Sequence, residues 1–293
     1  MENARQRIVV PIRRETTTIG LILLESAQSE PCPDETLNFL ARLSDHAAIA
    51  IANAQLYEEV KEANLAKSRF VSFVAHELKN PMASIKGYTE LVSSGMAGPV
   101  NEMQSSFLAT VRSNVERMAR MVADLGDINK LDGQGLKFTP TAVPLQAALD
   151  EALRPFENAI AQKGQTVTRV IPEDLPALWC DHDRLVQVLG NLLSNAHIYT
   201  PEGGVITITA ELTPDASAVR VAVRDNGIGI LPEEQPRIFE MFFRASDEET
   251  RKNPGNGLAL HLSRRLVEQQ GGRLWFESQR GAGSTFILQL PTS

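Results

Sequence analysis

One helical pattern runs almost unbroken from Glu35 to about Val92, and it limits the fold of this chain of 293 residues more than any other feature. Its first half places apolar residues at helical spacing: Leu37, Leu40, Leu43, Ala47, Ala50, Ala54, Leu56 and Val60. The preceding PCPDE ends an extended stretch and offers Asp34 as the helix N-cap. A periodic pattern much longer than about 25 residues is typical of a coiled coil or a long bundle. We therefore expect two or three domains rather than one globule.

A loop with two glycines and a proline, SSGMAGPVN (93–101), separates this helix from a second one. The second helix carries apolar residues spaced three and four apart: Leu108, Val111, Val115, Met118, Val122 and Leu125. The first helix has a matching seam: Val71, Val74, Leu78, Pro81, Ile85, Tyr88 and Val92. Two helices with one seam each form a hairpin that cannot close a core alone. We predict that two hairpins form a four-helix bundle, which makes the chain a homodimer.

Two short apolar stretches, 7–13 and 18–25, precede the long helix and are predicted to be strands joined by a polar turn at Glu15 and Thr16. Two strands and a helix do not make an independent core, because an isolated hairpin is marginal in water. We expect the chain to begin inside a domain whose first part lies outside this sequence.

From about residue 145 the pattern changes to mixed strands and helices. The predicted strands are 166–171, 205–212, 219–225, 273–278 and 284–290. The predicted helices are 145–163, 181–196 and 258–270. This order predicts an α/β sandwich, with helices on one face of a mixed, mostly antiparallel sheet.

Composition limits the partners and the compartment. The net charge of −7 favours neither nucleic acid nor an anionic membrane as a partner. The longest apolar runs, IGLILL and AAIAIA, are too short for a membrane-spanning helix, and the start does not resemble a signal peptide. Two cysteines, Cys32 and Cys180, make neither a disulfide framework nor a zinc module. We predict a cytoplasmic protein without a membrane segment.

His76 lies among apolar residues in FVAHELKNPM and is the first candidate for chemistry. If Val71 and Val74 occupy heptad positions a and d, His76 falls at f, the most exposed position. Asn80, four residues on, shares this outward face, and Glu77 lies beside it. An exposed histidine next to a carboxylate that holds its tautomer is suited to act as a nucleophile.

Two other interpretations of His76 are weaker. A lone histidine among apolar residues is usually a core residue, but the heptad register argues against that here. A metal site is disfavoured because no second His or Cys lies at helical ligand spacing. Pro81 removes an amide from the helix, and we expect a kink just past His76.

Three glycine clusters mark the C-terminal part: DNGIGI (225–230), GNGLAL (255–260) and RGAGSTF (280–286). Each alone is a weak signal, since glycines are common in turns. Gly257 is more informative, because free amides and the dipole at a helix N-terminus favour phosphate. The segment 244–255 has no large apolar residue, so it is either a plain solvated loop or a mobile lid over a ligand.

Asn191 and Asn195 share one face of a predicted helix whose other face is apolar. Asparagine is disfavoured in helix interiors, so a pair there suggests a task beyond folding. Their amide oxygens could hold Mg²⁺ between nucleotide phosphates, while the alternative for a lone pair is surface decoration.

Six motifs along the chain, in this order, resemble those of a sensor histidine kinase of two-component systems. HELKNP resembles the H-box, NLLSNAHIYTP the N-box and DNGIGI the first G-box. FEMFFRA resembles the F-box, and GNGLAL and GAGSTF the later G-boxes. The likeness runs from about Ser68 to the C-terminus and implies a HisKA dimerisation domain followed by a HATPase_c (GHKL) ATP-binding domain. VVPIRRETTTIGLILLES through DHAAIAIANAQLYEEV is similar to the last third of a GAF sensor domain.

The resemblance implies five segments along the chain. They are residues 1–58 as the C-terminal part of a GAF domain, 59–67 as a helical linker, 68–132 as the phosphotransfer hairpin, 133–144 as a second linker and 145–293 as the ATP-binding domain.

The resemblance also implies roles for the candidate residues. His76 would attack the γ-phosphate of ATP, and Glu77 would take or hold the proton on the other ring nitrogen. The phosphoryl group would then pass to an aspartate of a response regulator receiver domain, with Asn80 supporting the reverse phosphatase reaction.

The nucleotide site that the resemblance implies spans all the glycine clusters. Asp225 would bind the adenine amino group, Asn191, assisted by Asn195, would hold Mg²⁺, and Arg244 would reach the γ-phosphate. The remaining implied nucleotide contacts are Tyr199, Gly227, Gly229, Gly255, Gly257, Leu258 and Thr285.

Two positions depart from the family pattern. Ile198 stands where the N-box usually has lysine, and loss of a charge-assisted contact should cost about 1.5–3 kcal/mol. Arg251 or Lys252 could compensate. Ala259 replaces a usual glycine, and its methyl group could crowd the lid. These departures keep open a nucleotide-binding scaffold or phosphatase with weak kinase activity.

A third hypothesis is another ATPase of the same nucleotide-binding fold. The H-box on a dimerising hairpin counts against it. So does Gln187, which stands where related ATPases place a catalytic glutamate.

Overall fold

The computed structural model describes residues 6–27, 32–133, 135–246 and 255–293. The chain divides into two compact units, 1–70 and 71–293, and the boundary falls inside one long helix, α1 (Asp34–Ser93). Within the described residues, no helix has both the length and the apolar character that crossing a membrane requires.

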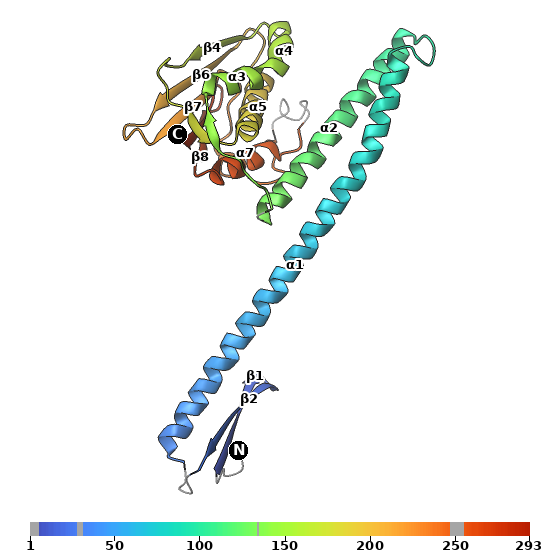
Figure 1. Cartoon of the computed structure of the whole chain (residues 1–293). Coiled ribbons are helices and arrows are strands. Elements are labelled where there is room, and N and C mark those ends of the chain that lie inside the picture. Colours follow the sequence, from blue (N-terminus) through green and yellow to red (C-terminus); the bar gives the residue numbers. More distant parts are fainter. Residues whose placement is uncertain (1–5, 28–31, 134, 247–254) are drawn as a thin grey trace. The chain divides into compact units, whose positions relative to one another are not determined.

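The first unit consists of a β-hairpin and the N-terminal part of α1 (Figure 1). Strand β1 (Gln6–Arg14) pairs antiparallel with β2 (Thr17–Ser26), so both predicted strands are confirmed to within a residue. The Ser44 hydroxyl donates to the Pro11 carbonyl at 2.7 Å and ties the helix to the hairpin. Leu21 and Leu23 are 64% and 57% exposed, so this unit leaves apolar surface uncovered.

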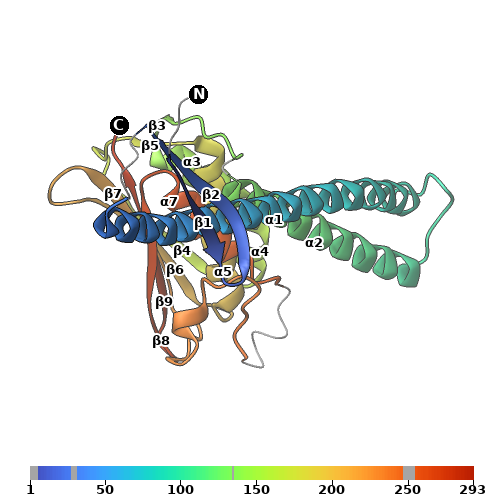
Figure 2. The ribbon, with the colours of Figure 1, turned by 90° about the horizontal axis from the view of Figure 1, so that it is seen from below.

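In the second unit, α1 from Val71 onward and α2 (Glu102–Asp132) form the predicted helical hairpin, and they lie side by side in both views (Figures 1 and 2). Asn101 begins α2 with a capping box: its side chain accepts from the Gln104 amide, and the Gln104 side chain accepts from the Asn101 amide. The connecting loop turns at Gly95 and Gly98, whose φ angles are +80° and +113°.

The hairpin buries a slightly different stripe of α1 than the predicted seam. Met82 and Thr89 are buried, whereas their neighbours Pro81 and Tyr88 are exposed. Leu78 and Ile85 of the predicted seam are also exposed, whereas Val71, Val74 and Val92 are half-buried. The single hairpin therefore leaves part of the seam uncovered.

The C-terminal domain contains a five-stranded sheet in the order β4-β6-β7-β9-β8. Its strands are β4 (Thr166–Val170), β6 (Val205–Leu212), β7 (Ala218–Asp225), β9 (Gly283–Pro291) and β8 (Arg273–Gln279). Among its described residues, β4 and β6 pair in parallel and the other neighbours pair antiparallel, which confirms the predicted mixed, mostly antiparallel sheet. A separate pair, β3 (Thr141–Val143) and β5 (Leu178–Cys180), was not predicted.

Helices cover one face of this sheet, as predicted. They are α3 (Leu145–Leu153), α4 (Glu157–Gln162), α5 (His182–Tyr199) and α7 (Ala259–Glu268), with short 3-10 turns η1 (Arg154–Phe156) and η2 (Gln235–Arg237). The prediction of a single helix over 145–163 was wrong. The helix is interrupted at η1, because Pro155 lacks the amide hydrogen that a continuous helix needs.

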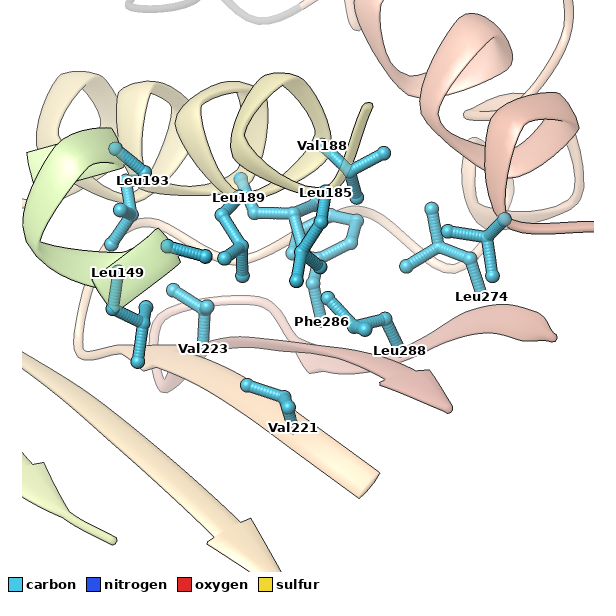
Figure 3. Close-up of a cluster of buried hydrophobic side chains, with 14 of the residues drawn as sticks. Leu149, Leu185, Val188, Leu189, Leu193, Val221, Val223, Leu274, Phe286 and Leu288 are labelled. Atoms are coloured by element: carbon cyan, nitrogen blue, oxygen red, sulfur yellow. The ribbon is translucent and has the colours of Figure 1, made fainter. Parts of the chain in front are cut away.

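The core lies between α5 and the sheet. Figure 3 shows Leu185 and Leu189 of α5 pointing toward Val223 and Leu288 of the strands. All four side chains are at most 1% exposed. This packing fixes the register of α5, and therefore the direction in which its polar residues point.

Candidate functional site

The glycine-rich loops and the C-terminal end of α5 meet around one pocket, which opens to solvent. The predicted site residues that line it are Asn195, Tyr199, Asp225, Gly229, Arg244, Gly255 and Gly257. The residues at both departures from the family pattern, Ile198 and Ala259, also line it.

Asp225, the last residue of β7, supplies a buried carboxylate to this pocket and is 5% exposed. Its Oδ1 accepts hydrogen bonds from the amides of Gly227 at 2.9 Å and Ser284 at 3.2 Å. Burial raises the pKa of Asp225, and the two amides oppose that rise. The geometry thus holds a hydrogen-bond acceptor in fixed orientation at the wall of the pocket.

Two glycines after Asp225 are required by close backbone approach. A Cβ on Gly227 would lie 2.3 Å from the Tyr199 carbonyl oxygen. Gly229 has φ +65°, and a Cβ there would lie 2.0 Å from the Gln279 carbonyl oxygen. The glycines predicted here therefore bring the loop against both α5 and the β8–β9 turn.

A second loop delivers backbone amides to the pocket at the N-terminus of α7. Gly257 has φ +68°, and a Cβ there would lie 2.5 Å from the Phe243 carbonyl oxygen. The Asn256 side chain accepts from the Leu258 amide at 3.0 Å and orders the approach to the helix. Free amides and the helix dipole at this end favour an anion.

The two asparagines of α5 point to different places. Asn195 lines the pocket, whereas Asn191 does not. The Asn191 amide nitrogen donates to Ser263 Oγ at 3.0 Å and to the Ala259 carbonyl at 3.4 Å, which holds α7 against α5. Gln187 also stays outside the pocket, where its oxygen accepts from Arg184 at 2.8 Å.

Two other predicted nucleotide-binding residues, Leu258 and Thr285, are not among the residues that line the pocket. Leu258 is 2% exposed and belongs to the hydrophobic core. Thr285 is on the opposite face of the sheet, because side chains alternate along β9 and it is Ser284 that lines the pocket. Ser284 was missed, although strand alternation in GAGSTF could have indicated it.

Three further polar or charged residues line the pocket: Tyr199, Glu234 and Arg244. Burial raises the pKa of the Tyr199 phenol, and the nearby Arg244 guanidinium opposes that rise. Glu234, another lining residue that the sequence did not reveal, accepts from both the amide and the hydroxyl of Ser246 at 2.7 Å each. Most of the predicted lid, including Arg251 and Lys252, lies outside the described residues.

His76 lies on α1 with its side chain 73% exposed, as the heptad register predicted. Its Nδ1 faces Glu77 Oε1 at 3.4 Å, a long hydrogen bond, and this leaves Nε2 as the ring nitrogen turned away from the carboxylate. Asn80, one helical turn on, is also exposed. These three polar groups therefore form an accessible site on the surface of the hairpin.

Comparison with known protein families matches three parts of the chain. Residues 1–53 match the GAF domain, and residues 66–134, which include His76, match the His Kinase A (phospho-acceptor) domain. Residues 180–293, which include the pocket, match the histidine kinase-, DNA gyrase B-, and HSP90-like ATPase family. In this order the three matches correspond to the architecture of a sensor histidine kinase. These matches confirm the resemblance on which the site assignments depend.

Individual relatives agree with this family. The chain is 29% identical to the sensor histidine kinase WalK of Bacillus subtilis (strain 168), over 92% of this chain and 44% of WalK. It is 32% identical to the adaptive-response sensory kinase SasA of Synechococcus elongatus, over 81% of this chain and 62% of SasA. The chain thus spans about half the length of these curated relatives.

Among solved structures, full-length ShkA in complex with AMPPNP shares the fold. The TM-score is 0.64 at 24% identity, and the match covers 77% of this chain and 46% of ShkA.

Proposed function

We propose that this chain is an ATP-dependent protein-histidine kinase. It autophosphorylates His76 and passes the phosphoryl group to an aspartate of a response regulator. One observation carries the proposal. A buried carboxylate, two loops that need glycine for close backbone approach and a helix N-terminus all meet at one pocket. The same chain also exposes a histidine beside a glutamate.

At the base end of the pocket, Asp225 accepts the hydrogen bond of the adenine amino group. Its Oδ1 is already engaged by two amides, so the carboxylate does not have to reorganise when the base arrives. Apolar side chains of Ile198, Ile228 and Phe286 contact the pocket and suit a flat aromatic ring.

At the phosphate end, the amides at the start of α7 and the guanidinium of Arg244 attract the negative charge of the triphosphate. Of the two asparagines, Asn195 lines the pocket and offers its amide oxygen here, whereas Asn191 is not among the lining residues and its amide nitrogen donates to Ser263 of α7.

Mg²⁺ fits this end of the pocket with few protein ligands. The described residues hold no cluster of three His, Cys, Asp or Glu that could bind a metal alone. An asparagine oxygen together with phosphate oxygens is the type of ligand set that Mg²⁺ accepts. When bound, Mg²⁺ neutralises charge on the phosphates.

At His76 the chemistry follows from the position of Glu77. The Nε2 lone pair attacks the γ-phosphorus, the N–P bond forms, and the bond from the γ-phosphorus to the bridging oxygen breaks to release ADP. Glu77 holds the proton on Nδ1, which fixes the tautomer that has its lone pair on Nε2. It stabilises the positive charge that develops on the ring.

A weakly active scaffold or phosphatase is the second candidate function. Ile198 lines the pocket where the family pattern has lysine, so one charge-assisted phosphate contact is absent at that position. Asn80 lies exposed one turn from His76, where it is suited to position water for dephosphorylation.

Labelling with γ-labelled ATP and Mg²⁺ distinguishes the two functions. A kinase gives an acid-labile, alkali-stable label that disappears in His76→Gln. No label in the wild type, together with label in Ile198→Lys, would favour the scaffold or phosphatase. Label that survives His76→Gln would refute the assignment of the acceptor.

The partners follow from the same proposal. A second copy of the chain covers the part of the α1 seam that the hairpin leaves exposed, and a receiver domain docks on the hairpin near His76. The predicted cytoplasmic location stays a prediction.

A further inference from the structure

The C-terminal end of α5 is held by two side chains that lie outside the pocket. Lys163 Nζ donates to the carbonyls of His197 at 3.0 Å and Ile198 at 3.1 Å. Gln165 Nε2 donates to the carbonyls of His197 at 3.1 Å and Thr200 at 2.8 Å. A helix leaves its last carbonyls without intrahelical partners. Lys163 and Gln165 therefore complete the end of the helix that carries Tyr199.

The orientation of Gln165 is fixed by its neighbours. The side chain is 7% exposed, and its nitrogen faces carbonyl oxygens, which only accept. Its oxygen consequently faces His197 Nδ1, at 2.6 Å, and Nδ1 must carry the hydrogen. Burial, followed by the Lys163 charge, lowers the pKa of His197 and favours the neutral ring. His197 thus reports on whether Gln165 is in place.

The held end of α5 in turn sets the position of the loop after Asp225. The Tyr199 carbonyl accepts from the Ile228 amide at 3.3 Å. The same oxygen lies 2.3 Å from the point where a Gly227 Cβ would be. The two backbone segments are therefore in direct contact. A shift of the end of α5 would move Tyr199 and Ile228, which both line the pocket.

We propose that Lys163 and Gln165 are positioning residues for nucleotide binding, which act through the end of α5 and the loop 226–230. This inference rests on the proposed ATP function. Lys163 also has an electrostatic part. Carbonyl groups at a helix C-terminus carry partial negative charge, which disfavours an anionic ligand nearby. The ammonium of Lys163 offsets that partial negative charge. The side chain of Ile198, at the same helix end, carries no positive charge.

The test compares Lys163→Met, Lys163→Arg and a control, Arg169→Met, in the full chain. The control removes the same charge from an exposed ion pair with Asp150, away from the pocket. Titration calorimetry with Mg-ATP should show that Lys163→Met weakens binding by about two- to fivefold. We expect KM to rise with little change in kcat, Lys163→Arg to restore most of the affinity, and Arg169→Met to match the wild type.

Gln165→Leu supplies a second readout that does not depend on catalysis. In ¹⁵N-histidine spectra, the His197 ring should lose its fixed Nδ1–H tautomer, and ATP affinity should fall in parallel. If Lys163→Met and Gln165→Leu lower Tm yet keep the wild-type ATP affinity, the residues are merely structural and the inference is wrong. If Gln165→Leu does not fold, Lys163→Met decides alone. A wild-type chain that fails to bind ATP would instead overturn the proposed function, and this inference with it.

Discussion

Asp225 keeps a charge in a place where the charge costs stability. Its pKa is raised in the folded chain, so its stabilising contribution is complete only below the unfolded value of 3.8, and it is lost as pH rises through the folded pKa. At neutral pH the ionised form therefore opposes folding. We interpret Asp225 as a residue held for ligand binding.

Asp225→Asn tests this interpretation, because asparagine keeps an oxygen for the two amides and removes the charge. We predict a higher Tm at pH 7, together with ATP binding weakened by about ten- to a hundredfold through loss of a charge-assisted hydrogen bond. Thermal melts at pH 7 and pH 4 and calorimetry measure both. The Tm difference should shrink at pH 4. A lower Tm with unchanged binding would contradict the interpretation.

Ile198→Lys restores the charge that the family pattern places in the pocket. We predict that ATP binds about tenfold more tightly or better, since a charge-assisted phosphate contact contributes about 1.5–3 kcal/mol. Val170→Lys is the matched control, because it adds the same charge at an exposed strand position outside the pocket. If the two variants bind ATP with equal affinity, a lysine at position 198 adds no phosphate contact, and the prediction is wrong.

At single positions, the sequence predicted what depends on local pattern. Exposure of His76 follows from heptad register, and the close approach at Gly227 and Gly229 follows from the residue type. The choice between Ser284 and Thr285 depends on which face of β9 meets the helices, and a motif match does not contain that information. Asn191 was expected in the pocket, but its partner Ser263 lies 72 residues away in sequence, and only tertiary packing brings the two together.

At the scale of elements, glycines separate into those that the backbone requires and those that it tolerates. Gly229→Ala would force a side chain into φ +65° and against the Gln279 carbonyl. Gly190→Ala, within α5, meets nothing within 4 Å. We predict that Gly229→Ala lowers Tm and abolishes ATP binding. Gly190→Ala should instead stabilise the domain by about 0.5–1 kcal/mol and leave ATP binding intact. Denaturant unfolding measures both, and a stable, ATP-binding Gly229→Ala would contradict the argument.

Element boundaries were predictable where a pattern is long or a breaker is plain. The strand over 205–212 matches β6 in both bounds, and the long helix matches α1 to within a residue. β3 and β5 were missed because three residues are too few to show a period. The helix over 145–163 was overextended because the apolar periodicity continues across Pro155, although the hydrogen-bond ladder cannot.

At the scale of the whole molecule, the exposed part of the α1 seam predicts self-association. Leu78, Ile85 and Tyr88 are 40%, 46% and 71% exposed in the single chain and recur at heptad spacing. We predict that Ile85→Asp combined with Tyr88→Asp converts a dimer into a monomer in light scattering. Ala83→Asp, on the other side of the helix, should remain dimeric. A wild-type chain that is monomeric at micromolar concentration would contradict the predicted homodimer.

The central claim joins the two parts of the second unit: the pocket binds ATP, and His76 receives its γ-phosphoryl group. The most direct measurement incubates the full chain with Mg-ATP and locates the phosphoryl group by mass spectrometry, with NMR to assign the ring nitrogen. The account predicts phosphate on Nε2 of His76, because Nδ1 faces Glu77. Phosphate on another residue, or none at saturating ATP, would contradict the claim. Phosphate on Nδ1 would contradict the role assigned to Glu77.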